Sequence, residues 1–353
     1  MSFALPPKNY PFGSLAGLAT PSPQYSGLGS LLTGGPTQSS LAATTLLGGA
    51  LAPTPSMHMW FFVTRRFTRL LAELTITDWQ REDGQTKQAG VRLCLNRYYW
   101  GVGSETANSM LIGSWGKNTR LRPPRDVDIL FLLPATVHAR FQERDGNRQS
   151  QLLQEVKEVL AQTYTQTTMR GDGQVVLIPF NSTPVEVAPG FRCRDGSIIV
   201  CDTNNGGSYI TSTAEAEASD LSASDALWNG NTRALARMAK QWQREHNVPL
   251  KSFQIERLAV HFLQSWSYSH QNVFYYDWMM RDFFAYLIRL ANGRLTMPGT
   301  GEIVPLGDDW KARAERAYSH AVEACNHERD NHEALAGQKW QTIFGTAVPE
   351  FVS

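Results

Sequence analysis

Cysteine is scarce in this chain: four cysteines occur among 353 residues, and none of them forms a CxxC pair. So few, widely separated cysteines do not make a disulfide framework. Long apolar runs are also missing, since runs such as Ile129–Leu133 are far too short to span a membrane. The opening residues, MSFALPPKNYPF, lack the basic and apolar regions of a secretory signal. These absences predict a cytoplasmic protein in a reducing compartment.

An excess of charge of one sign is missing as well. The chain has 33 basic and 32 acidic residues, which gives a formal net charge of +1. Proteins dedicated to duplex DNA usually carry a marked basic excess, because affinity grows with the number of phosphates neutralised. We therefore expect no requirement for duplex DNA.

Charge is almost absent from residues 1–56, where Lys8 is the one charged residue among eight prolines and eight glycines. This composition without helical or strand periodicity is typical of a low-complexity arm. Its leucines leave open a second interpretation, in which the arm packs on a partner or on the body of the protein.

From residue 57 the pattern becomes that of a folded α+β protein. Apolar residues at helical spacing, then short apolar runs, then helical spacing again predict two N-terminal helices, a block of strands and a helical C-terminal part. The helices are expected at 59–74, at about 78–100, at 226–246, at 252–266, at 277–293 and, as one continuous helix, over much of 308–344; the strands are expected at 110–113, 126–133, 175–180, 185–189 and 197–201. The expected divisions are an arm (1–56), a sheet lobe with the N-terminal helices (57–205) and a helical lobe (206–353).

Two aspartates at the start of one apolar strand suggest chemistry. In DVDILFLL, Asp126 and Asp128 are two residues apart and therefore share a face of the strand. Like charges at this spacing need a cation between them, and magnesium takes carboxylates together with phosphate oxygens. A solvated turn is the alternative interpretation of such a short motif.

The surrounding sequence favours a phosphate site. Gly113 and Ser114 follow a strand and precede a short helical segment, where glycine lets the backbone approach a phosphate and helix amides can bind it. Two-metal phosphoryl transfer also uses a third acid from a neighbouring strand, and Glu186 in VEVAP fits this role. The alternative for Glu186 is an exposed position on an edge strand.

These motifs resemble those of a known family. GSWGKNT, then DVDILFLL, then VEVAP are similar to the nucleotidyltransferase signature of the polymerase-β superfamily. The layout of residues 57–351 resembles more narrowly the CD-NTases, bacterial relatives of cyclic GMP-AMP synthase and oligoadenylate synthase. The resemblance implies a bilobal fold in which a mixed-sheet lobe and a helical C-terminal lobe are joined by long N-terminal helices.

The resemblance also implies roles for particular residues. Asp126, Asp128 and Glu186 would be the catalytic and metal-binding acids, with glutamate where the family often has aspartate. The nucleotide would be bound by further residues in both lobes, namely Gly113, Ser114, Lys240, Ser252 and Phe253. Without the family, Lys240 would be a solvated helix lysine and Phe253 a core residue. Arg120, Arg122 and Arg125 flank the aspartates and would either neutralise phosphate or form a solvated basic loop.

The implied function is Mg²⁺-dependent condensation of ATP and/or GTP into a cyclic di- or trinucleotide second messenger in anti-phage signalling. Two Mg²⁺ ions would act, with Mn²⁺ as a substitute. A separate effector protein would read the product, and a regulatory protein partner is a further expectation. No membrane association is expected.

Several alternatives remain open from the sequence. The enzyme could act on RNA ends or on a protein hydroxyl, or the chain could be an inactive nucleotide-binding module or an interaction protein working through its arm. A zinc site at His320, Cys325, His327 and His332 is disfavoured, because on one continuous helix these side chains do not converge.

Overall fold

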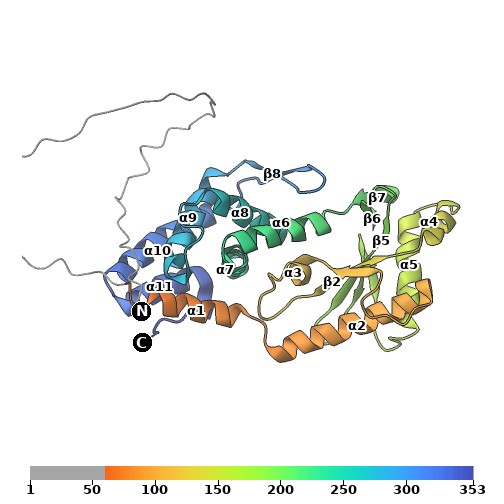
Figure 1. Ribbon diagram of the computed structural model, residues 1–353, viewed down its shortest axis with the longest axis horizontal. Coiled ribbons are helices and arrows are strands. Elements are labelled where there is room, and N and C mark those ends of the chain that lie inside the picture. Colours follow the sequence, from red (N-terminus) through yellow and green to blue (C-terminus); the bar gives the residue numbers. More distant parts are fainter. Residues whose placement is uncertain (1–59, 353) are drawn as a thin grey trace, which may run out of the picture. The chain divides into compact units, whose positions relative to one another are not determined.

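The computed structural model describes residues 60–352, which form a sheet lobe and a helical lobe (Figure 1). The expected arm, residues 1–56, lies outside the described residues. The elements in chain order are α1(Val63–Leu74), α2(Asp78–Trp100), β1(Ser109–Leu111), α3(Gly113–Gly116), β2(Val127–Leu132), α4(Ala135–Gln142), α5(Arg148–Ala161), β3(Arg170–Asp172), β4(Val175–Ile178), β5(Val185–Arg192), β6(Ile198–Asp202), β7(Ser208–Thr211), α6(Ala214–Leu227), α7(Asn231–Glu245), α8(Ser252–Ser265), α9(Tyr276–Arg289), β8(Arg294–Thr296), β9(Ile303–Pro305), α10(Lys311–Arg329) and α11(Glu333–Phe344).

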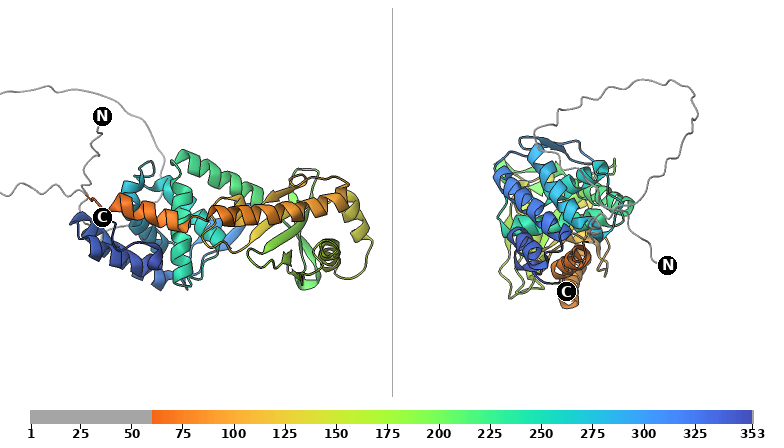
Figure 2. Two further views of the ribbon diagram at one scale, coloured as in Figure 1. Left: turned by 90° about the horizontal axis from the view of Figure 1, so that it is seen from below. Right: turned by 90° about the vertical axis from the view of Figure 1, so that its left-hand side faces the viewer.

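The two N-terminal helices follow one another along both lobes (Figure 2, left). Thr77 separates them as the N-cap of α2, where its hydroxyl accepts from the Gln80 amide and the Gln80 side chain bonds back to the Thr77 amide. Gly101 ends α2 in the left-handed conformation, and the helix ends where the sequence predicts. The apolar face of α1 joins the core of the helical lobe, whereas Val91 and Leu95 of α2 join the core of the sheet lobe.

The main sheet has seven strands, and its centre is the pair β2 and β5. The strand order is β1-β2-β5-β4-β3, and β6 pairs with both β5 and β7. β2 runs parallel to β5, and every other pair in this sheet is antiparallel. The sheet is therefore mixed, which confirms the expected fold class. The boundary expected between 205 and 206 falls in the turn between β6 and β7, so the sheet continues to Thr211.

Successive side chains of β2 point to opposite faces of the sheet, and the two faces have different surroundings. Val127, Ile129 and Phe131 are buried in the core that α2 and α5 cover. Asp128 and Leu130 point to the opposite face, where Leu130 belongs to a smaller apolar cluster. Asp128 is consequently the polar end of an otherwise apolar strand.

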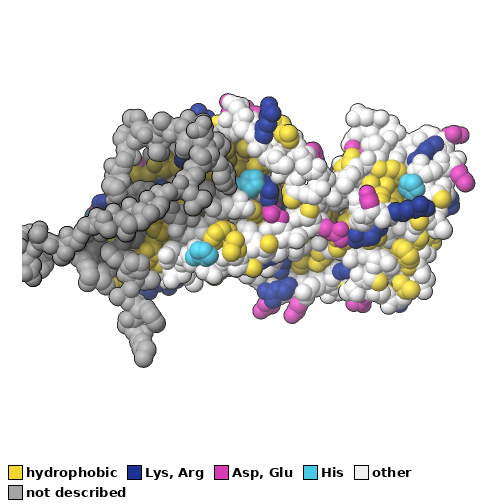
Figure 3. Space-filling model, turned by 45° about the horizontal axis from the view of Figure 1, so that its top comes forward, with side chains coloured by type: hydrophobic (Ala, Val, Ile, Leu, Met, Phe, Trp, Pro, Cys, Tyr) yellow, Lys and Arg dark blue, Asp and Glu magenta, His cyan; other side chains and the backbone are white. Residues whose placement is uncertain are grey.

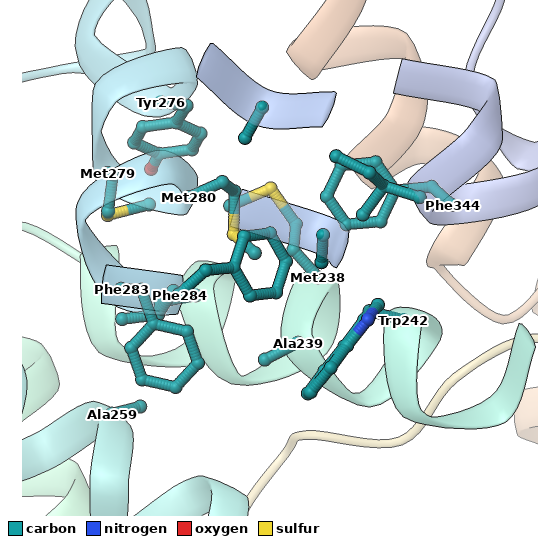
Figure 4. Packing of buried hydrophobic residues seen from close by; sticks show 14 of the residues in the cluster. Met238, Ala239, Trp242, Ala259, Tyr276, Met279, Met280, Phe283, Phe284 and Phe344 are labelled. Carbon is teal, nitrogen blue, oxygen red and sulfur yellow. The ribbon is translucent and has the colours of Figure 1, made fainter. Parts of the chain in front are cut away.

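The helical lobe is built around a large aromatic and aliphatic core. Trp242 of α7 and Phe284 of α9 pack edge to face with their ring centroids 5.1 Å apart. Figure 4 shows Met238, Ala239 and Phe344 lining the same core. Trp340 and Phe344 of α11 are fully buried, so the C-terminal segment is an integral part of this lobe.

The structure also corrects several boundaries expected from the sequence. The helix expected over 226–246 is two helices, because Asn229 and Gly230 adopt positive φ angles of 53° and 84° between α6 and α7. The continuous helix expected within 308–344 is also wrong, since Asn331 has a φ of 56° between α10 and α11. Several elements were not expected at all, namely α4, α5, most of α6, β3, β7 and the β8–β9 hairpin.

The described surface mixes both signs of charge. Figure 3 shows basic and acidic side chains interspersed on the face that it presents, in keeping with the net charge of +1. Among residues 60–352, no helix combines the length and apolar character needed to cross a membrane.

Candidate active site

Three carboxylates meet at one end of the central strand pair. The register of the parallel ladder places Asp128 of β2 directly beside Glu186 of β5. Asp126 lies two residues before Asp128, and each of the three residues offers a carboxylate oxygen within 4.8 Å of the others. Val127, Val185 and Val187 are fully buried on the opposite face, which holds both strands in this register. The predicted sharing of one face by Asp126 and Asp128, with Glu186 alongside, is present in the structure.

The electrostatics of this cluster favour a cation. Burial raises the pKa of Asp128 to about 7, and the nearby charges of Asp126 and Glu186 act in the same direction. Burial also raises the pKa of Asp126, although Arg125 and Lys240 oppose that effect. Three oxygen donors that repel one another suit a hard divalent ion such as Mg²⁺. The residues present therefore fit the metal site that the sequence predicts.

Gly113 and Ser114 begin the short helix α3 next to the carboxylates. Gly113 has a φ of 57°, and a Cβ atom there would lie 2.0 Å from Asp128 Oδ2. Glycine is thus required both by the backbone conformation and by the close approach of the metal site. The Ile112 amide donates to the Asp128 carbonyl at 3.0 Å, and the Thr119 amide donates to the Ser114 carbonyl at 3.0 Å. These bonds fix the turn against β2.

A pocket of about 310 Å³ connects this turn to the helical lobe. Its lining includes Asp126 and Asp128 from the sheet lobe and Lys240, Ser252 and Phe253 from the helical lobe. Glu186 is not part of that lining and stands beside Asp128. Phe253 is only partly buried, so it faces the pocket rather than a core. The structure therefore brings the candidate nucleotide-binding residues around one cavity.

Lys240 is a buried, hydrogen-bonded residue of this pocket and not a solvated helix lysine. Its Nζ donates to the Thr119 carbonyl at 3.1 Å and lies 3.1 Å from Glu256 Oε1. The residue is only 7% exposed. Its charge is consequently already balanced within the protein.

The residues that surround Lys240 were not predicted from the sequence. Lys117 Nζ contacts Glu256 Oε2 at 2.6 Å and Glu217 Oε2 at 2.7 Å, and the Thr119 hydroxyl donates to Glu256. Burial alone would raise the pKa of Glu256, but Lys240 and Lys117 outweigh burial and lower it. Glu256 is thus an ionised carboxylate between two ammonium groups. One feature of the sequence could have indicated these residues. Lys117 and Glu256 each lie one helical turn after a predicted nucleotide-binding pair, Gly113–Ser114 and Ser252–Phe253.

The three arginines near the aspartates are used differently. Arg120 and Arg125 line the pocket, and the guanidinium of Arg120 lies 4.6 Å from the Trp115 ring centroid. Arg122 instead pairs with Glu73 at 2.9 Å and donates to the Glu73 carbonyl at the end of α1. Arg244 of α7 also lines the pocket and donates to the Arg122 carbonyl at 3.0 Å.

The histidine and cysteine side chains near the end of α10 have other contacts. Cys325 is buried, and its Sγ donates to the Asp277 carbonyl at 3.5 Å. His327 lies on α10, whereas His332 follows the break at Asn331 and stands at the N-cap of α11. The helix expected to run continuously through these residues is therefore broken between α10 and α11. Within residues 60–352, Asp126, Asp128 and Glu186 form the one group of three or more such side chains suited to a metal ion.

A mixed sheet that presents three carboxylates beside a Gly-Ser turn, with a helical lobe across the pocket, defines a polymerase-β-like nucleotidyltransferase. Comparison with known proteins makes the class narrower. Residues 62–224 match the family model of the Second Messenger Oligonucleotide or Dinucleotide Synthetase (SMODS) domain. These residues are thus similar to the nucleotidyltransferase domains of the SMODS family, and the resemblance to CD-NTases is confirmed.

Solved structures share the fold over most of the chain. Vibrio cholerae DncV, a cyclic AMP-GMP synthase solved with a linear intermediate, has a TM-score of 0.62 and 13% identity over 82% of this chain and 96% of its own. E. coli MS115-1 CdnC, solved with ATP, has a TM-score of 0.57 and 16% identity over 83% and 99%. The CdnC complex with HORMA-deltaN gives 0.58 and 15% over 81% and 98%. No curated protein sequence matches the chain.

Proposed function

We propose that this protein condenses ATP and/or GTP into a cyclic di- or trinucleotide second messenger for anti-phage signalling. The observation that carries the proposal is the register of Asp128 beside Glu186, which places three carboxylates next to the Gly113 turn. The SMODS match supports the reaction class. The proposed setting is the cytoplasm, where nucleoside triphosphates are abundant.

In this proposal the triphosphate lies in the pocket between the lobes. The backbone amides of Gly113 and Ser114 and the hydroxyl of Ser252 would donate hydrogen bonds to phosphate oxygens. Phe253 would stack on the base. Lys240, whose charge Glu256 already balances, would hold the Thr119 turn at the edge of the nucleotide site. Arg120 and Arg125, which line the same pocket, would contribute charge nearer to solvent.

Asp126, Asp128 and Glu186 would hold two Mg²⁺ ions, with Mn²⁺ as a substitute. Such ions, when bound, stabilise both the attacking and the leaving oxygen of a phosphoryl transfer. The chain's own contribution is to fix three carboxylates through two buried strands, so that no reorganisation is needed at the moment of reaction. The acceptor would be a ribose hydroxyl of the second nucleotide and later of the linear product.

The proposed partners follow from the same comparison. CdnC has been solved with ATP and with HORMA-deltaN, and DncV with ATP and GTP. By analogy we propose ATP and GTP as substrates, a regulatory protein partner, and a separate effector that reads the product. Duplex DNA is not proposed as an activator, because the chain carries no basic excess.

The test is incubation of the full-length protein with all four radiolabelled nucleoside triphosphates and MgCl₂ or MnCl₂, followed by nuclease mapping and mass spectrometry. Cyclic products lacking a free triphosphate are expected. Asp126→Asn should abolish them while the protein stays folded, whereas Asp195→Asn, at an exposed turn between β5 and β6, should not. Label found only on added RNA or on protein would contradict the proposal.

A further inference from the structure

A buried ion pair between Lys117 and Glu256 joins the two lobes beside the pocket. Lys117 is the C-cap residue of α3 in the sheet lobe, whereas Glu256 lies on α8 in the helical lobe. Their charged atoms are 2.6 Å apart, and the side chains are 8% and 5% exposed. Glu217 of α6 adds a second carboxylate at 2.7 Å from Lys117. A charge pair nearly removed from water therefore spans the boundary between the lobes.

The position of this pair within its two helices matters. Lys117 follows Ser114 by three residues, and Glu256 follows Phe253 by three residues. Residues three or four apart lie on the same side of a helix, one turn away from each other. The proposed nucleotide site has two halves, Ser114 in the sheet lobe and Phe253 in the helical lobe. Lys117 thus lies one helical turn after the first half, and Glu256 lies one turn after the second. All four residues line the same pocket.

Lys117 is not arranged as a phosphate ligand. Its ammonium group already contacts two carboxylates, which raise its pKa although burial opposes them. The other oxygen of Glu256 is occupied by the Thr119 hydroxyl and Lys240. Charge in this cluster is balanced before a nucleotide arrives, so the cluster holds protein segments to one another.

We propose that Lys117 and Glu256 are positioning residues that hold the Gly113–Ser114 turn at a fixed distance from Ser252 and Phe253. This inference rests on the proposed function, because the distance matters only if one nucleotide contacts both halves. Its phosphates would bind at the turn in the sheet lobe, and its base at Phe253 in the helical lobe. Loss of the Lys117–Glu256 contact would leave both halves intact and loosen the connection between them, with the Thr119 contacts remaining.

Lys117→Met is the most selective change. It leaves Glu256 with Lys240 and Thr119, and Glu217, whose side chain is 17% exposed, can turn towards water. The matched control is Arg192→Met, which breaks another ion pair between the lobes, from β5 to Glu215 of α6. That pair is 43% and 49% exposed, so its loss should have little effect.

The experiment is a double-mutant cycle on nucleotide affinity. Full-length wild type, Lys117→Met, Phe253→Ala and the double variant are titrated calorimetrically, in MgCl₂, with an ATP analogue whose α–β phosphate bridge is a methylene group. Lys117→Met should weaken binding about tenfold in the wild-type background and less than about threefold once Phe253 is absent, because coupled residues are not additive. Lys117→Arg should restore most of the affinity. If Lys117→Met does not fold, Glu256→Gln takes its place in the cycle.

An equal loss of affinity in both backgrounds would mean that Lys117 binds phosphate directly. No loss of affinity in either background would mean that the ion pair is only structural. Both results overturn the inference. The proposed function is tested independently of the ion-pair inference. A wild type that binds the analogue but makes no oligonucleotide from ATP and GTP would refute the function while the cycle still tests the ion pair. A wild type that makes product with an additive cycle would refute the ion-pair inference alone.

Discussion

Asp128→Asn should make the metal-free protein more stable at alkaline pH, although it removes a residue of the proposed catalytic centre. Burial and the charges of Asp126 and Glu186 raise the pKa of Asp128 from 3.8 to about 7. The folded state therefore binds this proton more tightly than the unfolded chain does. Stability contributed by the protonated carboxyl is present at low pH and is lost as pH rises towards 7. Above that pH the folded protein carries the full cost of the buried charge.

The size of the effect follows from the shift. A pKa that rises from 3.8 to about 7 sets an upper limit of about 4 kcal/mol on the destabilisation. The pocket is open to solvent and the other two carboxylates can adjust, so we expect about half of that limit. For a folded part of this size, about 2 kcal/mol corresponds to a rise in Tm of about 4 °C.

The assay is thermal unfolding in EDTA at about pH 8 and about pH 5, because the gain should fall by more than half at the lower pH. Millimolar MgCl₂ should then reverse the order, since wild type gains a bound ion that the variant holds poorly. Asp83→Asn is the matched control: burial would raise the pKa of Asp83, but Lys87 and Ser182 lower it overall, so this variant should lose stability. A metal-free Asp128→Asn protein that is less stable than wild type at about pH 8 would refute the electrostatic reasoning.

Three further predictions concern turnover and activation. Glu186→Gln should lower kcat about 100-fold or more with little change in nucleotide affinity, whereas Glu186→Asp keeps partial activity; near-wild-type rates for both would exclude Glu186 from the site. Gly113→Ala should abolish product formation in the same assay, because its Cβ would meet Asp128 Oδ2 at 2.0 Å, and retained activity would show that the turn can move. Purified protein should need no duplex DNA. A salt-sensitive stimulation by duplex DNA would contradict this expectation, because it would reveal a basic surface that the net charge of +1 conceals.

Local patterns predicted well where the three carboxylates lie, because strand periodicity determines which side chains share a face. Asp126 and Asp128 needed only that rule, and Glu186 needed the further assumption that its strand lies next to theirs. The contacts of Lys117 with Glu217 and Glu256 span 100 and 139 residues of sequence, and no local pattern reports such pairings. The helix breaks were missed for a related reason. Asparagine tolerates the left-handed conformation, but nothing nearby in the sequence shows that it adopts it at Asn229 and Asn331.

The distribution of charge in the pocket suggests how binding and catalysis are divided between the lobes. The two lysines that line it are balanced by Glu256 and Glu217 and are largely committed to holding the lobes together. On the sheet, burial and the repulsion of Asp126 and Glu186 raise the pKa of Asp128. A metal-bound triphosphate would relieve that repulsion and extend towards the pocket arginines, Arg120 and Arg125. The network around Glu256 would then keep its contacts during the reaction, because it has no net charge for the substrate to neutralise.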